Sequence, residues 1–213
     1  MKPLLICDCD EVLMTFAGPF AEHLDEMHGL ELKLESFALA GNIRRKSDGE
    51  PVPQSALRGL LGDFFSRGMH RQVPAPGAPE ALASLKADFD IVILTNIEDE
   101  YRDGRREQLR RHGMTYEVFC NSGPKGPALS RLLADHGRPP AVFVDDLPPH
   151  HQSVSEVEPQ VHRIHMVADP TLRSLIPAAK AAHARIDDWP SASTYLSRLV
   201  AEKTLADGGA VRR

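Results

Sequence analysis

Short apolar runs recur along the chain, and polar or turn residues follow each of them. Each run is rich in β-branched or other apolar residues, too short for a buried helix and the right length for a strand buried on both faces. We therefore predict strands at Leu4–Cys7, Ile91–Leu94, Val118–Cys120, Ala141–Val144 and Val161–Val167.

Segments of helical length lie between most of these runs. They are Pro79–Ala87, Glu98–His112, Pro127–His136 and Thr171–Ala184, and a last helix is expected from near Pro190. Strands that alternate with helices predict an α/β fold with a doubly wound parallel sheet. The predicted core domain comprises residues 1–13 and 73–207, and residues 208–213 are predicted to be a disordered tail.

One long interval interrupts the alternation after the first strand. Between Leu13 and Val73 no strand is evident, but "FAGPFAEHLDEMHGL" and "PQSALRGLLGDFFSRGM" carry apolar residues at helical spacing. The strand and helix pattern returns after the Pro- and Gly-rich "VPAPGAPE". We predict that residues 14–72 form a small helical cap domain inserted into the core.

Composition narrows the class of protein. Hydrophobic residues make up 42% of the 213 residues and the formal net charge is −5, which argues against a disordered chain and against a nucleic-acid partner. Three cysteines do not form a disulfide framework, and no apolar stretch approaches the ~20 residues of a membrane helix. We expect a cytoplasmic protein without a membrane partner; the oligomeric state cannot be inferred.

The arginines that follow the second predicted strand fit an ordinary exposed helix. Acidic residues begin this segment and basic residues end it, as the helix dipole favours. We interpret the following arginines as a solvated helix face rather than a nucleic-acid site: Arg102, Arg105, Arg106, Arg110 and Arg111.

Polar residues with chemical potential stand at the ends of the predicted strands. In a parallel sheet, ligands bind beyond the carboxyl ends of the strands, where the strand order reverses. The residues expected there are Asp8, Asp10, Thr95, Asn96, Asp145 and Asp146, with Lys125 just before a helix. Four carboxylates with a hydroxyl and an ammonium group are hard ligands that suit Mg²⁺.

These motifs resemble those of the haloacid dehalogenase (HAD) superfamily. A hydrophobic strand ends in Asp8-Cys9-Asp10, "DIVILTN" ends a strand in Thr95, Lys125 precedes a helix and "AVFVDD" ends in paired acids. All four motifs occur in order, and the resemblance covers residues 2 to about 167. It implies a Rossmann-like core with a cap, and an Mg²⁺-dependent phosphoric monoester hydrolase acting on a small phosphorylated metabolite.

The resemblance also implies a role for each motif residue. Asp8 would be the nucleophile and Asp10 the general acid and base, while Thr95, Asn96 and Lys125 would bind the phosphoryl group. Mg²⁺ would be held by Asp8, Asp10, Asp145 and Asp146. The second acid favours a phosphatase, because dehalogenases similar to this core lack it.

Two residues depart from the family pattern. Glu11 stands where the family commonly has Gly, and it would repel a phosphate unless it points away or pairs with a base. His150 stands where similar sequences often have Asn. Zinc binding by Cys7 and Cys9 with His150 and His151 downstream is disfavoured, because the spacing matches no usual ligand pattern.

The cap offers candidate substrate contacts and leaves other functions open. Arg44, Arg45 and Lys46 are either a solvated charge run or bases that reach the substrate. A phosphonatase would need Lys46 or Lys33 as an imine-forming lysine. A mutase, or a binding or regulatory protein with weak phosphatase activity, is a further alternative.

Overall fold

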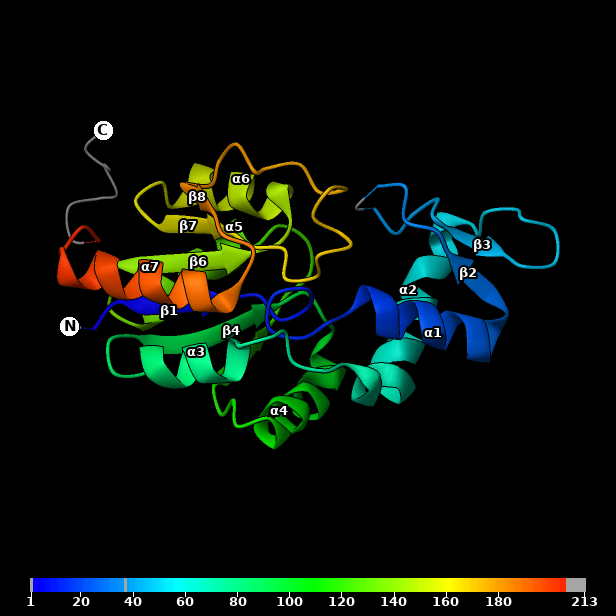
Figure 1. Cartoon of the computed structure of the whole chain (residues 1–213), viewed down its shortest axis with the longest axis horizontal. Helices are drawn as coiled ribbons and strands as arrows, with labels where there is room; N and C mark the ends of the chain where they lie inside the picture. The colour runs from blue at the N-terminus through cyan, green and yellow to red at the C-terminus, as the bar shows by residue number, and fades with distance from the viewer. Residues whose placement is uncertain (1, 37, 206–213) are drawn as a thin grey trace.

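The computed structural model describes residues 2–36 and 38–205, and its core is a six-stranded parallel sheet (Figure 1). The spatial order of the strands is β5-β4-β1-β6-β7-β8. This arrangement confirms the predicted doubly wound α/β core. The predicted tail, 208–213, lies outside the described residues. The strands are β1 (Leu4–Cys7), β4 (Asp90–Thr95), β5 (Glu117–Cys120), β6 (Ala141–Asp145), β7 (His162–His165) and β8 (Ala184–Arg185).

Helices cover both faces of the sheet. Successive strand residues point to opposite faces, and both sets are apolar. Leu5 and Cys7 of β1 pack in a cluster that includes α3 (Ala78–Leu85), α7 (Trp189–Ala201) and Leu109 of α4 (Arg102–Arg111). Leu4 and Ile6 pack in the opposite cluster, with α5 (Gly126–Asp135) and α6 (Pro148–Val157). The strand is therefore buried on both faces, as its uninterrupted apolar sequence predicts.

The interval after β1, which is predicted to be a cap and is called the cap below, lies beside the core, at the right of Figure 1. Its helices pack through an aromatic cluster in which Phe16, Phe20, Phe64 and Phe65 contact one another. The expectation that this interval lacks strands is wrong, because β2 and β3 form an antiparallel pair of three residues each. The cap elements are α1 (Ala17–His28), β2 (Leu30–Leu32), β3 (Ile43–Arg45), α2 (Gln54–Asp63), a π-helical turn (Phe64–Gly68) and a 3₁₀ turn (Met69–Arg71).

Two adjacent chain segments connect the cap to the core. The Thr15 N–H donates to the Val73 carbonyl at 2.9 Å, and the Val73 N–H donates to the Thr15 hydroxyl at 3.2 Å. Ala75 N–H donates to the Leu13 carbonyl at 2.8 Å. These hydrogen bonds hold the two segments side by side, so any rotation of the cap must act through them.

In the second half of the chain, one predicted helix is wrong and one observed helix was not predicted. The segment Thr171–Ala184 is not a helix but a series of turns that leads into β8. Pro177 lies in its middle, where it lacks a donor and clashes with the preceding helical turn. Arg185 and Arg173 instead bind backbone carbonyls of this region, including those of Ile176 and Asp187. Helix α6 was not predicted, because "PPHHQSVSEV" has little apolar periodicity.

The helix expected over Glu98–His112 forms as a 3₁₀ turn, Asp99–Tyr101, followed by α4. None of the helices in the described residues is both long and apolar enough to span a membrane.

Candidate active site

The strand order brings three predicted residues to one edge of the sheet. β1 lies between β4 and β6, with Cys7 in register with Ile93 and Val144. Asp8 directly follows β1, while Thr95 and Asp145 are the last residues of β4 and β6. This is the point where the chain reverses direction across the sheet, at which open α/β folds bind their ligands.

Lys125 joins two of the predicted acids. Its Nζ lies 2.6 Å from Asp8 Oδ1 and 2.7 Å from Asp145 Oδ2, and its side chain is fully buried. Burial alone would lower the pKa of Lys125, but the two carboxylates raise it above its usual value. The ammonium group therefore stays charged and holds Asp8 and Asp145 in fixed positions.

The carboxylates at this edge outnumber the cation that balances them. Asp8, Asp145 and Asp146 are buried, and each has an oxygen within 4.8 Å of the others. Burial raises the pKa of Asp8 to about 7 against the opposing effect of Lys125, and burial with the charge of Asp145 raises the pKa of Asp146. Burial would also raise the pKa of Asp145, but Lys125 lowers it. Three hard oxygen donors with one ammonium group fit a divalent cation such as Mg²⁺.

Thr95 and Asn96 stand beside these acids. The Thr95 hydroxyl is buried and has no hydrogen-bond partner among the described residues. A buried hydroxyl without a partner is unfavourable unless a ligand supplies one. Asn96 is fixed by its side chain, which donates to the Gly123 carbonyl at 2.9 Å and accepts from Asn121 at 2.8 Å.

Asp10 is held by an arginine that the sequence analysis assigned to a solvated face. Arg105 is fully buried, and its Nη2 donates to Asp10 Oδ1 at 2.8 Å and to Oδ2 at 3.0 Å. The interpretation of Arg105 as solvated is therefore wrong. The signal that could have revealed it is spacing, because Arg105 lies four residues before the buried Leu109 and thus on the same helix face.

Two glutamines complete this arrangement. Gln72 donates to Asp10 Oδ1 at 2.6 Å and to the Thr15 carbonyl at 2.9 Å, so it joins the acid to both segments that connect the cap. Gln108 accepts from Arg105 at 2.9 Å and donates to the Met69 carbonyl at 2.6 Å. No sequence motif indicated Gln72 or Gln108.

Glu11 caps a helix instead of pairing with a base. Its Oε1 accepts the N–H groups of Phe16 and Ala17, at 2.9 and 2.6 Å, where α1 begins. Burial raises the pKa of Glu11 to about 7, against the effect of these two hydrogen bonds. The backbone of Glu11 has φ of 59°, a left-handed conformation that Gly adopts without strain. This conformation explains why Gly suits the position, and the capping contact explains how Glu is accommodated.

Histidines support the backbone of the paired acids. His151 Nε2 lies 3.0 Å from the Asp145 carbonyl, and His165 Nε2 lies 2.8 Å from the Asp146 carbonyl. Burial lowers the pKa of His151 to about 4 and also lowers the pKa of His165 and His150. These rings are therefore neutral near pH 7, and His151 and His165 donate hydrogen bonds to the carbonyls of Asp145 and Asp146, which orients this part of the backbone.

The cysteines take no part in a metal site among the described residues. Cys7 and Cys9 are free, buried and packed in the apolar core cluster. Neither belongs to the groups of side chains whose geometry can hold an ion in the described part of the chain. Their role is packing, as small apolar side chains.

The basic residues predicted for the cap are not brought to the acids. Arg45 pairs with Asp48, Lys46 pairs with Asp25, and Arg44 donates to the Gly49 carbonyl at 3.2 Å. Lys33, the other candidate for an imine-forming lysine, pairs with Glu31 at 3.0 Å. None of the four lines the two cavities described next.

The edge of the sheet that carries Asp8, Asp10, Asp145 and Asp146 is here called the acid edge. A cavity of about 280 Å³, here called the inner chamber, lies over it. Its core side is formed by Asp8, Asp10, Glu11, Asn96, Asp146 and His150. Its other side is formed by apolar side chains of the cap and of the loop after β7, among them Phe16, Leu39, Leu61, Phe65, Leu172 and Leu175.

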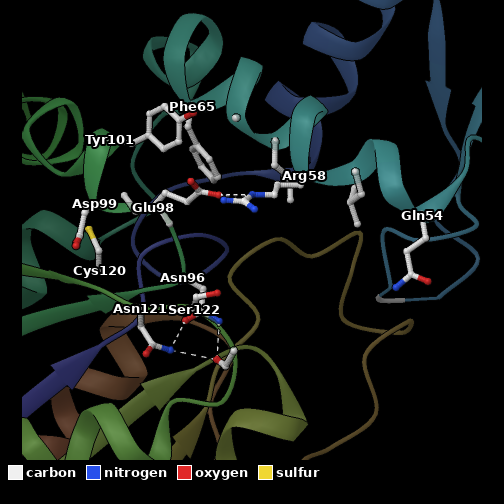
Figure 2. Close-up of a pocket in the computed structure, with 15 residues that line it drawn as sticks. Gln54, Arg58, Phe65, Asn96, Glu98, Asp99, Tyr101, Cys120, Asn121 and Ser122 are labelled. Atoms are coloured by element: carbon white, nitrogen blue, oxygen red, sulfur yellow. Dashed lines mark hydrogen bonds and ion pairs between the residues drawn. The ribbon is translucent and has the colours of Figure 1, made fainter.

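A second and wider cavity of about 870 Å³, here called the outer cavity, lies beside it (Figure 2). The two share Leu61, Phe65 and Asn96 as lining residues. Arg58 of α2 forms an ion pair with Glu98 of the core at 2.8 Å in this cavity, and the Asn96 and Asn121 side chains meet at its base (Figure 2). Arg58 is thus a basic residue of the cap that does line a cavity near the acids.

A second group of side chains with metal-ligating atoms lies in the cap. His23 and His28 of α1 both contact Asp63 Oδ2, at 2.8 and 2.9 Å, at the end of α2. Burial would raise the pKa of Asp63, but hydrogen bonds from both histidines and Arg67 lower it to about 2. This group joins the two cap helices through a carboxylate that remains ionised.

Solved structures of haloacid dehalogenase-like proteins have a fold similar to that of this chain. A predicted phosphoglycolate phosphatase from Haemophilus somnus is 14% identical, with a TM-score of 0.65, 92% of this chain and 98% of that chain covered. A putative β-phosphoglucomutase from Thermotoga maritima is 15% identical, with a TM-score of 0.56 and coverages of 92% and 99%. An L-2-haloacid dehalogenase is 12% identical, with a TM-score of 0.61 and coverages of 92% and 100%.

These structures define the fold and not the reaction, since their names cover three chemistries. No family model matches the sequence. No curated protein matches it either.

Proposed function

We propose that the protein is a phosphoric monoester hydrolase that forms an aspartyl-phosphate on Asp8. One arrangement carries the proposal: buried Lys125 bridges Asp8 and Asp145 beside the unpartnered hydroxyl of Thr95. An ammonium group and a hydroxyl donor at a carboxylate nucleophile suit an attacked phosphoryl group, whose oxygens carry negative charge.

The reaction would proceed in two displacements. A carboxylate oxygen of Asp8 attacks phosphorus, and the bond from phosphorus to the leaving oxygen breaks. The leaving oxygen takes a proton from Asp10. Water then attacks the phosphorus of the aspartyl-phosphate and gives its proton to Asp10, which releases inorganic phosphate and restores the Asp8 carboxylate.

The chain's own residues would orient each step. Lys125 and the Thr95 hydroxyl bind phosphoryl oxygens, with the main-chain N–H of Asn96 as a third donor. Mg²⁺ would be held by the side chains of Asp8, Asp145 and Asp146 with the Asp10 carbonyl, and it would balance charge on the phosphoryl oxygens. Because both oxygens of Asp10 accept hydrogen bonds from Arg105, a proton on Asp10 would compete with these contacts.

The presence of Asp10 favours phosphoryl transfer over dehalogenation, because a halide leaves without a proton. The contacts of Lys33 and Lys46 disfavour a phosphonatase, which would need one of them as a free amine over Asp8.

The test is a screen of phosphate monoesters with Mg²⁺ and, separately, with EDTA. We expect Mg²⁺-dependent turnover that falls more than about a thousandfold in Asp8→Asn. Asp135→Asn, which removes an exposed carboxylate at the end of α5, should keep wild-type turnover. Equal turnover in wild type and Asp8→Asn would contradict the assignment of the nucleophile.

A further inference from the structure

The side of the inner chamber opposite the acids is almost entirely hydrocarbon. Leu39 comes from the cap loop between β2 and β3, Leu61 and Phe65 from α2 and the π-helical turn, and Leu172 and Leu175 from the loop after β7. Leu34 and Leu175 pack with a cluster that contains Leu172, so the cap loop and this core loop meet over the chamber. A substrate bound at Asp8 therefore projects its leaving group into an apolar enclosure.

Polar groups from the cap are nearly absent from this lining. Ser36 is the one cap hydroxyl among the described lining residues, and its Oγ lies 3.2 Å from the Asn42 amide, which donates to it. No Lys or Arg side chain is among them. A leaving group rich in hydroxyls or carrying a carboxylate would lose its hydration here without gaining partners, which would weaken its binding.

The volume of the chamber limits the size of the leaving group. At about 280 Å³ it lies at the small end of ligand cavities. Because the phosphoryl end occupies the region of Asp8 and Asn96, the remaining space suits one ring or a short branched chain. The polar ion pair of Arg58 with Glu98 belongs to the outer cavity and not to this enclosure (Figure 2).

We propose that the substrate is a phosphate monoester of a small apolar alcohol or phenol, with its hydrocarbon group held by Leu39, Leu61, Phe65 and Leu175. This inference rests on the proposed phosphatase function for its reaction, but not for its binding preference. It separates this chain from enzymes that act on sugar phosphates or phosphoglycolate, which need polar contacts to the leaving group.

The first experiment compares kcat/KM for phenyl and isobutyl phosphate with kcat/KM for glycerol 3-phosphate and phosphoglycolate. We expect the apolar esters to be favoured by at least about tenfold. A preference for the polar esters would overturn the inferred substrate class while leaving the phosphatase function in place.

Substitutions on both sides of the chamber test where the preference arises. Leu39→Asn in the cap and Leu175→Asn in the core loop should each raise KM for phenyl phosphate about tenfold and change KM for glycerol 3-phosphate much less. Met27→Gln, an exposed cap residue outside the chamber lining, is the matched control and should change neither. Equal effects of Leu39→Asn on both esters would count against a specific apolar contact.

A binding experiment decides the question independently of turnover. Titration calorimetry of Asp8→Asn with phenylphosphonate and with phosphonoacetate, both in Mg²⁺, should show at least about tenfold tighter binding of phenylphosphonate. Equal affinities, or tighter binding of phosphonoacetate, would overturn the inference. If no monoester is hydrolysed by the wild type, the proposed reaction fails, and this titration still accepts or rejects the apolar chamber as a ligand site.

Discussion

Arg105 shows how one side chain can decide the environment of Asp10, the proposed general acid. The guanidinium group is fully buried, contacts both oxygens of Asp10 and lies 5.6 Å from the centre of the Phe65 ring. Burial alone would lower the pKa of Arg105, but Asp10 raises it, so the arginine remains charged. The guanidinium group and the Asp10 carboxylate each depend on the other as a hydrogen-bond partner, because neither is fully hydrated.

Removing either partner alone should therefore be more harmful than removing both. We expect Arg105→Met to lower the free energy of unfolding by about 3 kcal/mol, because it leaves Asp10 with Gln72 as its one described side-chain donor. The double variant Arg105→Met with Asp10→Asn should recover part of this loss. Urea denaturation of the four proteins measures the coupling, and strictly additive losses would show that the pair is not energetically linked.

The residues of the acid edge differ in how far sequence could predict them. Asp8, Thr95 and Asp145 follow from motifs at strand ends, since parallel strands deliver those ends to one place, and Lys125 follows from its position just before a helix. Arg105 could be found only from helix spacing. Gln72 could not be found, because its contact with Asp10 depends on how the cap is connected.

At the scale of elements, the strands were predictable and the segments between them less so. β1 forms over the predicted residues, because an uninterrupted apolar run is favourable in a strand that is buried on both faces of the sheet. The three-residue strands β2 and β3 escaped detection, since a pattern needs more residues than that to show a period. The loop after β7 was predicted to be a helix. Its apolar residues instead pack against the cap and the core from a series of turns, and they do not form one side of a helix.

Helix α1 begins on a buried carboxylate, and this makes its start sensitive to pH. In the folded protein the pKa of Glu11 is raised to about 7, so between its unfolded value of 4.5 and 7 the folded state binds a proton that the unfolded state has lost. Stability therefore falls as pH rises through this window, by about 3 kcal/mol for the full shift.

Glu11→Gln keeps an oxygen that can accept from Phe16 and Ala17 but removes the charge. Measured in EDTA, this variant should gain stability over the wild type on going from about pH 5 to about pH 8. Urea midpoints of both proteins at the two pH values provide the test. A constant difference between them would mean that Glu11 does not titrate in this range.

At the scale of the whole molecule, buried histidines oppose the effect of Glu11. His162 is buried, stacks on His183 with ring centroids 4.6 Å apart and lies 3.0 Å from the Tyr195 hydroxyl. Burial lowers the pKa of His162 to about 4, and burial lowers the pKa of His151 and His165 as well. Below the usual histidine pKa of 6.5 the unfolded chain therefore takes up protons that the folded protein excludes.

The buried ring of His162 should accordingly contribute a loss of stability of about 3 kcal/mol on acidification from about pH 6.5 to about pH 4. His162→Phe should weaken this dependence, because phenylalanine preserves the stacking and cannot be protonated. Thermal unfolding at several pH values compares the slopes. If His162→Phe and wild type share one slope, the ring at 162 is not excluded from protonation.

The contact between Trp189 and Val12 affects the order in which parts of the protein can fold during synthesis. The fully buried indole of Trp189 donates to the Val12 carbonyl at 2.8 Å, which ties the start of α7 to the turn that carries Asp10 and Glu11. These two residues are separated by 177 positions in sequence. A ribosome must therefore synthesise the chain from Val12 to beyond Trp189 before this turn acquires the hydrogen bond from the indole. Until then, the turn has its sequence but lacks a contact that fixes its conformation.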